Sequence, residues 1–111
     1  WDEERCIEQI KQLVRLPERP TAIFAASDII AMASLTALYS QKIRVPEEMA
    51  VIGLSDIELS RYSTPPLTTI RIPTREIGML AVRTLLQRIQ GDTSLPRSIT
   101  RPGTLVTRDS T

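Results

Sequence analysis

Apolar residues in the first part of the chain follow three patterns. The first has helical spacing and ends at Pro17, and its apolar members are Cys6, Ile7, Ile10, Leu13 and Val14. Residues 21–26 form a short apolar run after Pro20, which predicts a strand buried on both faces of a parallel sheet. Residues 29–41 contain no charged side chain and are rich in Ala and Leu. This composition predicts a helix that is covered on most sides.

The second part of the chain repeats this alternation of strand and helix. Runs of apolar and β-branched residues predict strands, and the periodic stretches between them predict helices. The expected elements are a strand at 49–54, a short helix at 57–62 ended by Pro65, a strand at 67–72, a long helix at 75–90 capped by Gly91, and one or two short strands within 98–107.

The predicted fold class is α/β, with a parallel sheet and helices on its faces, because buried strands and helices alternate. In such sheets ligands bind outside the carboxyl ends of the strands. Two Ser-Asp pairs, Ser27-Asp28 and Ser55-Asp56, follow the strands at 21–26 and 49–54. Their oxygen atoms, together with backbone donors at the helix amino termini, are suited to a small polar ligand.

Helix capping is the plainer interpretation of each Ser-Asp pair, since Ser and Asp are preferred at the amino-terminal cap. Capping and ligand contact do not exclude each other. The uncharged stretch 29–41 also has two interpretations. It is a helix buried within its own domain, or a helix partly buried by a second copy of the chain.

Composition excludes several classes of function. Fourteen Lys and Arg against 13 Asp and Glu leave a net charge of +1, so DNA binding by this segment itself is not expected. One Cys and no His predict no disulfide, metal site or cofactor. No nucleophile with a basic partner is visible, and we expect no catalytic residues. The absence of a long apolar stretch and of a signal peptide predicts a cytoplasmic protein without membrane contact.

Several phrases closely resemble the last third of LacI/GalR-family transcriptional regulators. In chain order they are PTAIFAASD at 20–28, RVPE at 44–47, VIGLSD at 51–56, RYSTPPLTTI at 61–70 and PGTLVTRDS at 102–110. The resemblance covers nearly the whole chain in the correct order. It implies the truncated, carboxyl-terminal part of a periplasmic-binding-protein-like effector domain, a three-layer lobe around a parallel sheet.

The resemblance also implies how the chain is divided between the two lobes of such a domain. Residues 1–72 belong to the carboxyl-terminal lobe, residues 73–97 form a helix of the other lobe, and residues 98–111 return to the first. The operator DNA is bound by an amino-terminal headpiece that this chain does not contain. The expected function is therefore to sense a small molecule, a sugar or related metabolite, and to form a homodimer.

Family positions that contact the effector carry over to Ser27, Asp28, Ser55, Asp56 and Ile72. Relatives commonly have Asp where this chain has Ser55, and often Gln at Ile72. Serine still donates and accepts, but the exchange removes a charge-assisted hydrogen bond worth about 1.5–3 kcal/mol. These departures leave room for an effector with fewer hydroxyl groups or with a phosphate.

Family dimer contacts correspond to the helix after Asp28 and to the segment before the paired prolines. The implied interface residues are Ile29, Met32, Leu35, Thr36, Tyr39, Leu59, Tyr62 and Ser63. Two alternatives remain open at this point. One is a transport-type periplasmic sugar-binding protein with the same architecture, and the other is a catalytic or phospho-accepting domain that uses Asp28 or Asp56.

Overall fold

The structure is a computed structural model and describes residues 3–95 and 97–111. Two compact units make up the chain. The first comprises Trp1–Arg71 and Thr104–Thr111, and the second comprises Ile72–Gly103. The predicted boundary at 72/73 is one residue after the first division, and the one at 97/98 is six residues before the second. The assignment of the middle segment to another lobe stays a prediction.

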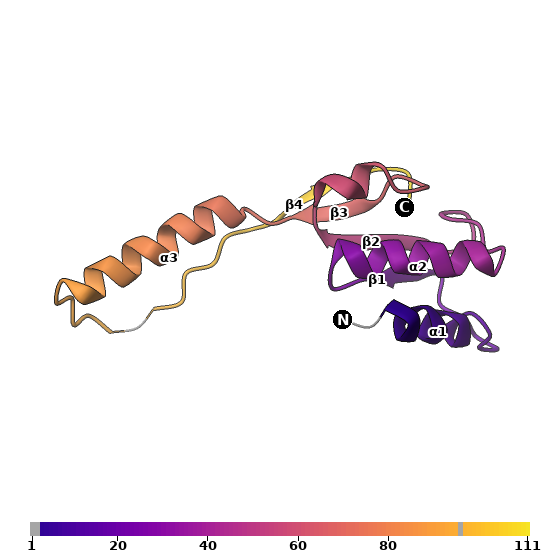
Figure 1. The fold of residues 1–111 in the computed structure, drawn as a ribbon, viewed down its shortest axis with the longest axis horizontal. Coiled ribbons are helices and arrows are strands. Elements are labelled where there is room, and N and C mark those ends of the chain that lie inside the picture. The colour runs from indigo at the N-terminus through magenta and orange to yellow at the C-terminus, as the bar shows by residue number, and fades with distance from the viewer. Residues whose placement is uncertain (1–2, 96) are drawn as a thin grey trace. The chain divides into compact units, whose positions relative to one another are not determined.

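A four-stranded sheet organises the first unit (Figure 1). Its order is β1 (Ala22–Phe24), β2 (Ala50–Ser55), β3 (Thr68–Arg71) and β4 (Thr104–Val106). The first three strands are parallel, and β4 runs antiparallel to β3. Helix α2 (Asp28–Ser40) connects β1 to β2, and the 3₁₀ turn η1 (Glu58–Arg61) connects β2 to β3. The predicted α/β class is confirmed.

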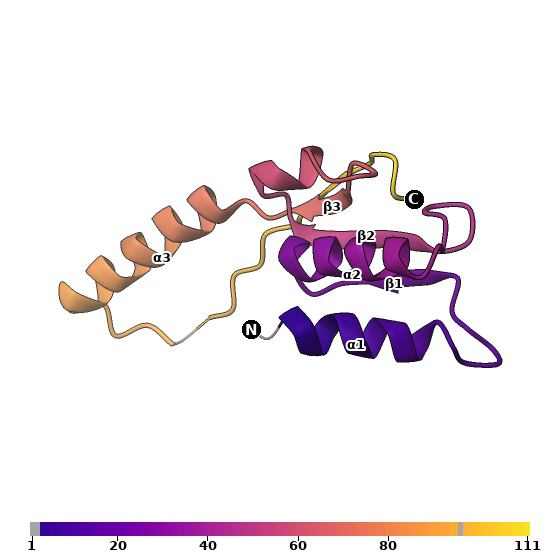
Figure 2. The same cartoon turned by 45° about the vertical axis from the view of Figure 1, so that its right-hand side comes forward.

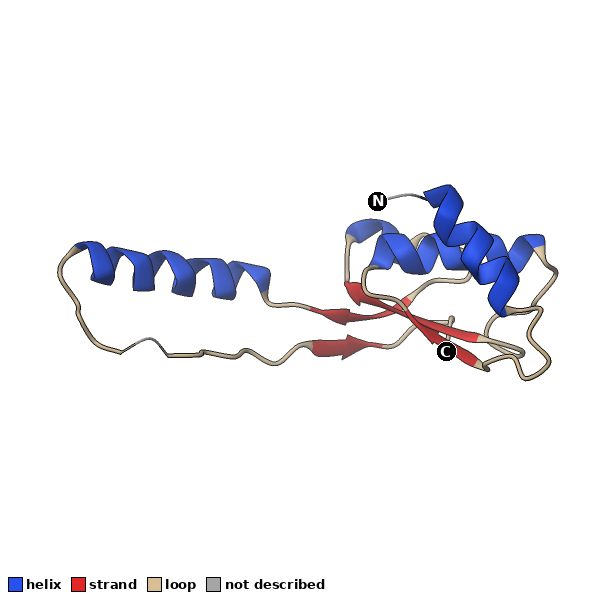
Figure 3. Cartoon of the chain, turned by 90° about the horizontal axis from the view of Figure 1, so that it is seen from below, coloured by secondary structure: helices blue, strands red, loops and turns tan. Residues whose placement is uncertain are grey.

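Helices α1 (Glu3–Leu13) and α2 pack on each other and lie on the same side of the sheet (Figure 3). The other side of β1 is open, because Phe24 is 62% exposed while its neighbour Ile23 packs against the core. The prediction that residues 21–26 are buried on both faces was therefore wrong, since Thr21, Ala22, Phe24 and Ala26 are exposed. Alternate side chains of a strand point to opposite faces, and the described helices cover only one of them.

The core of the first unit lies between the helices and the sheet. Its buried apolar side chains come from α2, from β2, from the residue just after β1 and from the residues just before β2 and β3: Ala25, Ala31, Leu35, Leu38, Met49, Val51 and Leu67. Ile10 and Val14 of the first helical segment pack against this cluster. Figure 2 shows α1, α2 and β1 running alongside one another in this region. Helix α2 thus belongs largely to its own domain, but Ile29 and Tyr39 remain exposed.

The second unit contains the helix α3 (Thr74–Ile89), as the pattern at 75–90 predicted. None of its residues is buried, and its exposed apolar side chains are Ile77, Met79, Val82, Leu85, Leu86 and Ile89. Arg101 bonds Glu76 across this unit. The apolar surface of α3 has no covering layer among the described residues of its own unit.

Candidate functional site

The carboxyl ends of the first two strands bring the two Ser-Asp pairs together. Ser27 precedes α2, and its hydroxyl accepts a hydrogen bond from the backbone N–H of Ile30 at 3.3 Å. This is the amino-terminal cap that its residue type predicts. Ser27 is half-buried, so capping leaves part of its side chain accessible at the edge of the sheet.

Asp28 differs from a typical ligand-binding residue because its carboxylate is buried inside the protein. It is 0% exposed, and its two carboxylate oxygens point to two other elements. Oδ2 accepts from the backbone N–H of Ile57 at 2.8 Å, and Oδ1 accepts from the Thr69 hydroxyl at 2.5 Å. Both oxygens are thus used inside the protein. The effector contact predicted for Asp28 stays a prediction for which this geometry shows no exposed oxygen.

The backbone turns sharply where β2 ends. Ser55 has φ 127° and Asp56 has φ 53°, so two successive non-glycine residues have positive φ. Asp tolerates the left-handed region, whereas the Ser55 value is strained. The Ser55 side chain is half-buried and makes no hydrogen bond to another described residue. A strained residue with a free hydroxyl at the ligand edge of a parallel sheet is the best candidate here for a polar contact with a small molecule.

Asp56 is held by two arginines. Its carboxylate is 4% exposed, with Oδ1 2.6 Å from Nη2 of Arg108 and Oδ2 2.6 Å from Nε of Arg71. Burial acts to raise the pKa of Asp56, but the hydrogen bonds and charges of Arg108 and Arg71 outweigh it and lower that pKa. An effector that reached this carboxylate would compete with two guanidinium groups, and its contact with Asp56 also stays a prediction.

Ile72 is the first residue of the second unit, outside the unit that carries the other four predicted effector residues. It is half-buried and lies beside Pro73 and Met79 on a shallow surface hollow of its own unit. The geometry of the first unit therefore does not test the effector contact predicted for Ile72.

The predicted dimer residues belong to the first unit, and most of those that are exposed are apolar or aromatic side chains of α2 and of the segment around η1. Tyr39, Tyr62 and Leu59 are 84%, 70% and 60% exposed, because no described element of the unit covers them. Leu35 differs, because it is 5% exposed and belongs to the core. Met32, Leu35, Thr36, Tyr39 and Ser63 also line one hollow, and Thr64 completes it.

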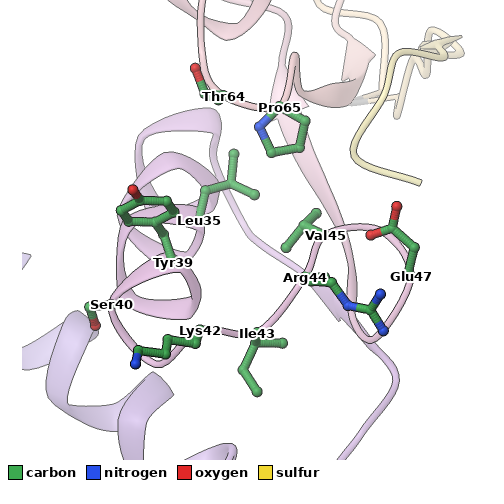
Figure 4. A pocket seen from close by; sticks show the side chains of 10 residues that line it. All are labelled: Leu35, Tyr39, Ser40, Lys42, Ile43, Arg44, Val45, Glu47, Thr64 and Pro65. Atoms are coloured by element: carbon green, nitrogen blue, oxygen red, sulfur yellow. The ribbon is translucent and has the colours of Figure 1, made fainter.

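A second hollow of about 730 Å³ adjoins the first and shares Leu35, Tyr39 and Thr64 with it. Figure 4 shows that its walls come from α2, from the loop that carries Arg44 and Val45, and from the turn with Pro65. The apolar wall is formed by Leu35, Ile43, Val45 and Pro65. Exposed Tyr39 thus stands at the border of both hollows, and exposed tyrosines are enriched at protein interfaces.

Sequence reasoning missed the residues that organise this edge. Thr69 and the two arginines Arg71 and Arg108 bind the predicted site residues Asp28 and Asp56. Arg108 is the clearest case, because it is largely buried. Its side chain is 13% exposed and donates to Asp56, Ser60 Oγ and the Leu67 carbonyl. No periodic pattern surrounds Arg108 in the sequence. The only sequence signal for its role is the identity of the residues next to it along the chain.

Among the described residues, no group of His, Cys, Asp and Glu side chains is placed to hold a metal ion. Among those same residues, no helix has the length and apolar character needed to cross a membrane.

Comparison with known proteins gives one family model, described as a periplasmic binding protein-like domain, that matches residues 1–111. A ribose operon repressor of Haemophilus influenzae is 42% identical over 110 residues. The match covers 99% of this chain and 33% of that protein. The transcriptional repressor PurR of Aliivibrio fischeri is 44% identical over 93 residues, covering 84% of this chain and 28% of its own length. The chain thus spans at most about a third of these relatives.

Solved structures with the same fold include a complex of the transcriptional regulator CelR with cellobiose, at a TM-score of 0.89 and 32% identity. The match covers 100% of this chain and 34% of that one. The lac repressor dimer bound to operator and an anti-inducer matches with a TM-score of 0.87 and 32% identity, over 100% of this chain and 38% of the other.

Proposed function

Because the chain belongs to the periplasmic binding protein-like domain family, and within it to the LacI/GalR-type transcriptional regulators, we propose that it forms one wall of an effector pocket and the dimer face of such a regulator. The effector is a small polar molecule, a sugar or related metabolite. Operator DNA is bound through a headpiece outside this chain, and the regulator acts in the cytoplasm without catalysing a reaction. Effector binding shifts the population between states that differ in operator affinity.

The strained Ser55 at the end of β2 is the observation that carries the effector part of this proposal. Its hydroxyl is free, whereas both carboxylates of the same edge are engaged inside the protein. Ser55 is therefore the polar side chain of the β2 end that an effector can reach without breaking an existing bond. A transport-type binding protein is not favoured, because the named relatives are repressors and regulators.

Ser55→Gly is expected to make the chain more stable and less able to bind its effector. Glycine accepts a positive φ without strain, and after its larger loss of backbone entropy the net gain is about 1 kcal/mol. Urea unfolding followed by circular dichroism measures this gain. In the intact protein that contains this chain, loss of the hydroxyl weakens effector binding roughly fivefold, the equivalent of one hydrogen bond.

The binding part is measured as the ligand-induced rise in melting temperature against a panel of small carbohydrates that includes cellobiose. Ser94→Gly, at an exposed residue of the second unit, is the matched control and leaves the ligand-induced rise unchanged. If Ser55→Gly binds the same carbohydrate as tightly as the wild type, Ser55 does not contact the effector.

The dimer part of the proposal predicts that Tyr39→Arg converts the chain from dimer to monomer. Tyr39 is 84% exposed in the single chain, so the substitution leaves the core intact. A loss of about 1 kcal/mol at each of two symmetry-related positions weakens dimerisation roughly thirtyfold. Sedimentation equilibrium measures the dissociation constant.

Two variants control this measurement. Tyr39→Phe keeps the apolar ring and retains the dimer, and Leu16→Arg places the same charge at an exposed apolar residue that lines neither hollow. A wild-type chain that sediments as a monomer at all concentrations contradicts the dimer part of the proposal. A dimer that Leu16→Arg dissociates and Tyr39→Arg does not places the interface elsewhere.

A further inference from the structure

The Asp28 carboxylate joins three elements of the first unit. Asp28 is the first residue of α2, Ile57 lies immediately before η1, and Thr69 belongs to β3. The two hydrogen bonds described above, to the Ile57 N–H and the Thr69 hydroxyl, each use a different oxygen of this carboxylate. One buried side chain therefore fixes α2, the start of η1 and β3 relative to one another.

The tie has little freedom to move. The Thr69 hydroxyl is itself 0% exposed and also accepts from the backbone N–H of Asp56 at 3.3 Å. On the opposite side, a Cβ atom at Gly53 would lie 2.3 Å from Asp28 Oδ1. The backbone of β2 thus lies directly against the carboxylate. A buried polar group with every partner satisfied and no spare space fixes geometry more strictly than apolar packing does.

The two elements joined by Asp28 and Ile57 are the two halves of the proposed dimer face. Helix α2 carries Tyr39, and η1 with the following turn carries Leu59 and Tyr62. No other hydrogen bond between the side chains of α2 and the segment 56–63 is present in the described residues. Among the described residues, the Asp28 carboxylate is therefore the side-chain hydrogen-bond link between these two halves. The same segment begins one residue after Ser55, the proposed effector contact.

We propose that Asp28 and Thr69 are positioning residues of the dimer face, which hold α2 and η1 in register and connect that face to the effector edge. This inference rests on the proposed dimer. It gives Asp28 a role other than the effector contact expected from the sequence. A shift of the β2–η1 turn on effector binding then changes the dimer face through one buried carboxylate.

Thr69→Val tests the inference, because valine has the shape of threonine and lacks only the hydroxyl. Without that hydroxyl, Asp28 loses the bond that fixes its Oδ1 and the register of the dimer face relaxes. We expect the dimer dissociation constant to rise at least tenfold, measured by sedimentation equilibrium at a temperature where every variant is folded. Thr69→Ser retains the hydroxyl and keeps the constant within about twofold of the wild type.

Val51→Ala is the control for loss of stability alone. Val51 is 0% exposed in the same core. Its apolar side chain takes no part in the hydrogen bonds that Asp28 makes with Ile57 and Thr69. The Val51→Ala substitution lowers the melting temperature and leaves the dimer dissociation constant unchanged. If Thr69→Val dimerises like the wild type, or no more weakly than an equally destabilised Val51→Ala, the inference is wrong and the proposed dimer stands. A monomeric wild-type chain overturns both.

Discussion

Gly53→Ala is expected to destabilise the first unit by about 3 kcal/mol, which is large for the addition of one methyl group. The new Cβ would lie 2.3 Å from Asp28 Oδ1 and 2.9 Å from Leu67 Cδ2. Neither neighbour can move freely, because Oδ1 is bonded to Thr69 and Leu67 is buried in the core. Relief therefore requires β2 to move away from β3 or the Asp28 tie to break.

Urea unfolding, followed by far-ultraviolet circular dichroism, measures this loss. Gly78→Ala is the matched control, since apart from its chain neighbours and the backbone of its own helix no atom lies within 4 Å of the added Cβ. Gly78 lies within α3, where alanine is favoured over glycine by about 1 kcal/mol, and the control variant gains helicity. A Gly53→Ala protein that unfolds within about 0.5 kcal/mol of the wild type contradicts the close approach of β2 to Asp28.

The order and type of the elements could be predicted from the sequence because each depends on local pattern. The helix at 29–41 is observed as Asp28–Ser40, and the strand at 49–54 as Ala50–Ser55. Phe24 shows where local pattern stops. An apolar residue in a strand indicates that something covers it, but the sequence of the strand does not say which element of the protein does so.

The candidate site was predicted less completely, for a different physical reason. The sequence correctly indicated that Ser27, Asp28, Ser55 and Asp56 lie at the strand ends, because parallel strands place their carboxyl ends at one edge. It gave no sign that Arg108 would fill the partner position of Asp56. These two residues are 52 positions apart, and side-chain partners at such separation follow from the three-dimensional arrangement alone. The sequence therefore predicts where in the sheet a strand-end carboxylate lies, whereas its role depends on the side chains that bond to it.

Arg108→Met is expected to cost about 3 kcal/mol at neutral pH, because it leaves a buried carboxylate with one of its two cations. Methionine keeps much of the apolar volume but donates no hydrogen bond to Asp56, Ser60 or the Leu67 carbonyl. The folded-state pKa of Asp56 is lowered, so its ionisation stabilises the fold above the ordinary carboxyl pKa of about 3.9. That contribution is lost as the pH falls through the lower, folded value.

Unfolding free energies of the wild type and of Arg108→Met, measured by urea titration between pH 7 and pH 2, therefore converge as the pH falls. Arg71→Gln is the control, since Arg71 is 57% exposed and its pair with Asp56 is worth at most about 1 kcal/mol in the presence of Arg108. Asp56→Asn combined with Arg108→Met recovers part of the loss, because no uncompensated charge then remains buried. Equal losses in Arg71→Gln and Arg108→Met, or a loss that does not change with pH, would show that the buried pair between Asp56 and Arg108 does not hold this edge of the sheet.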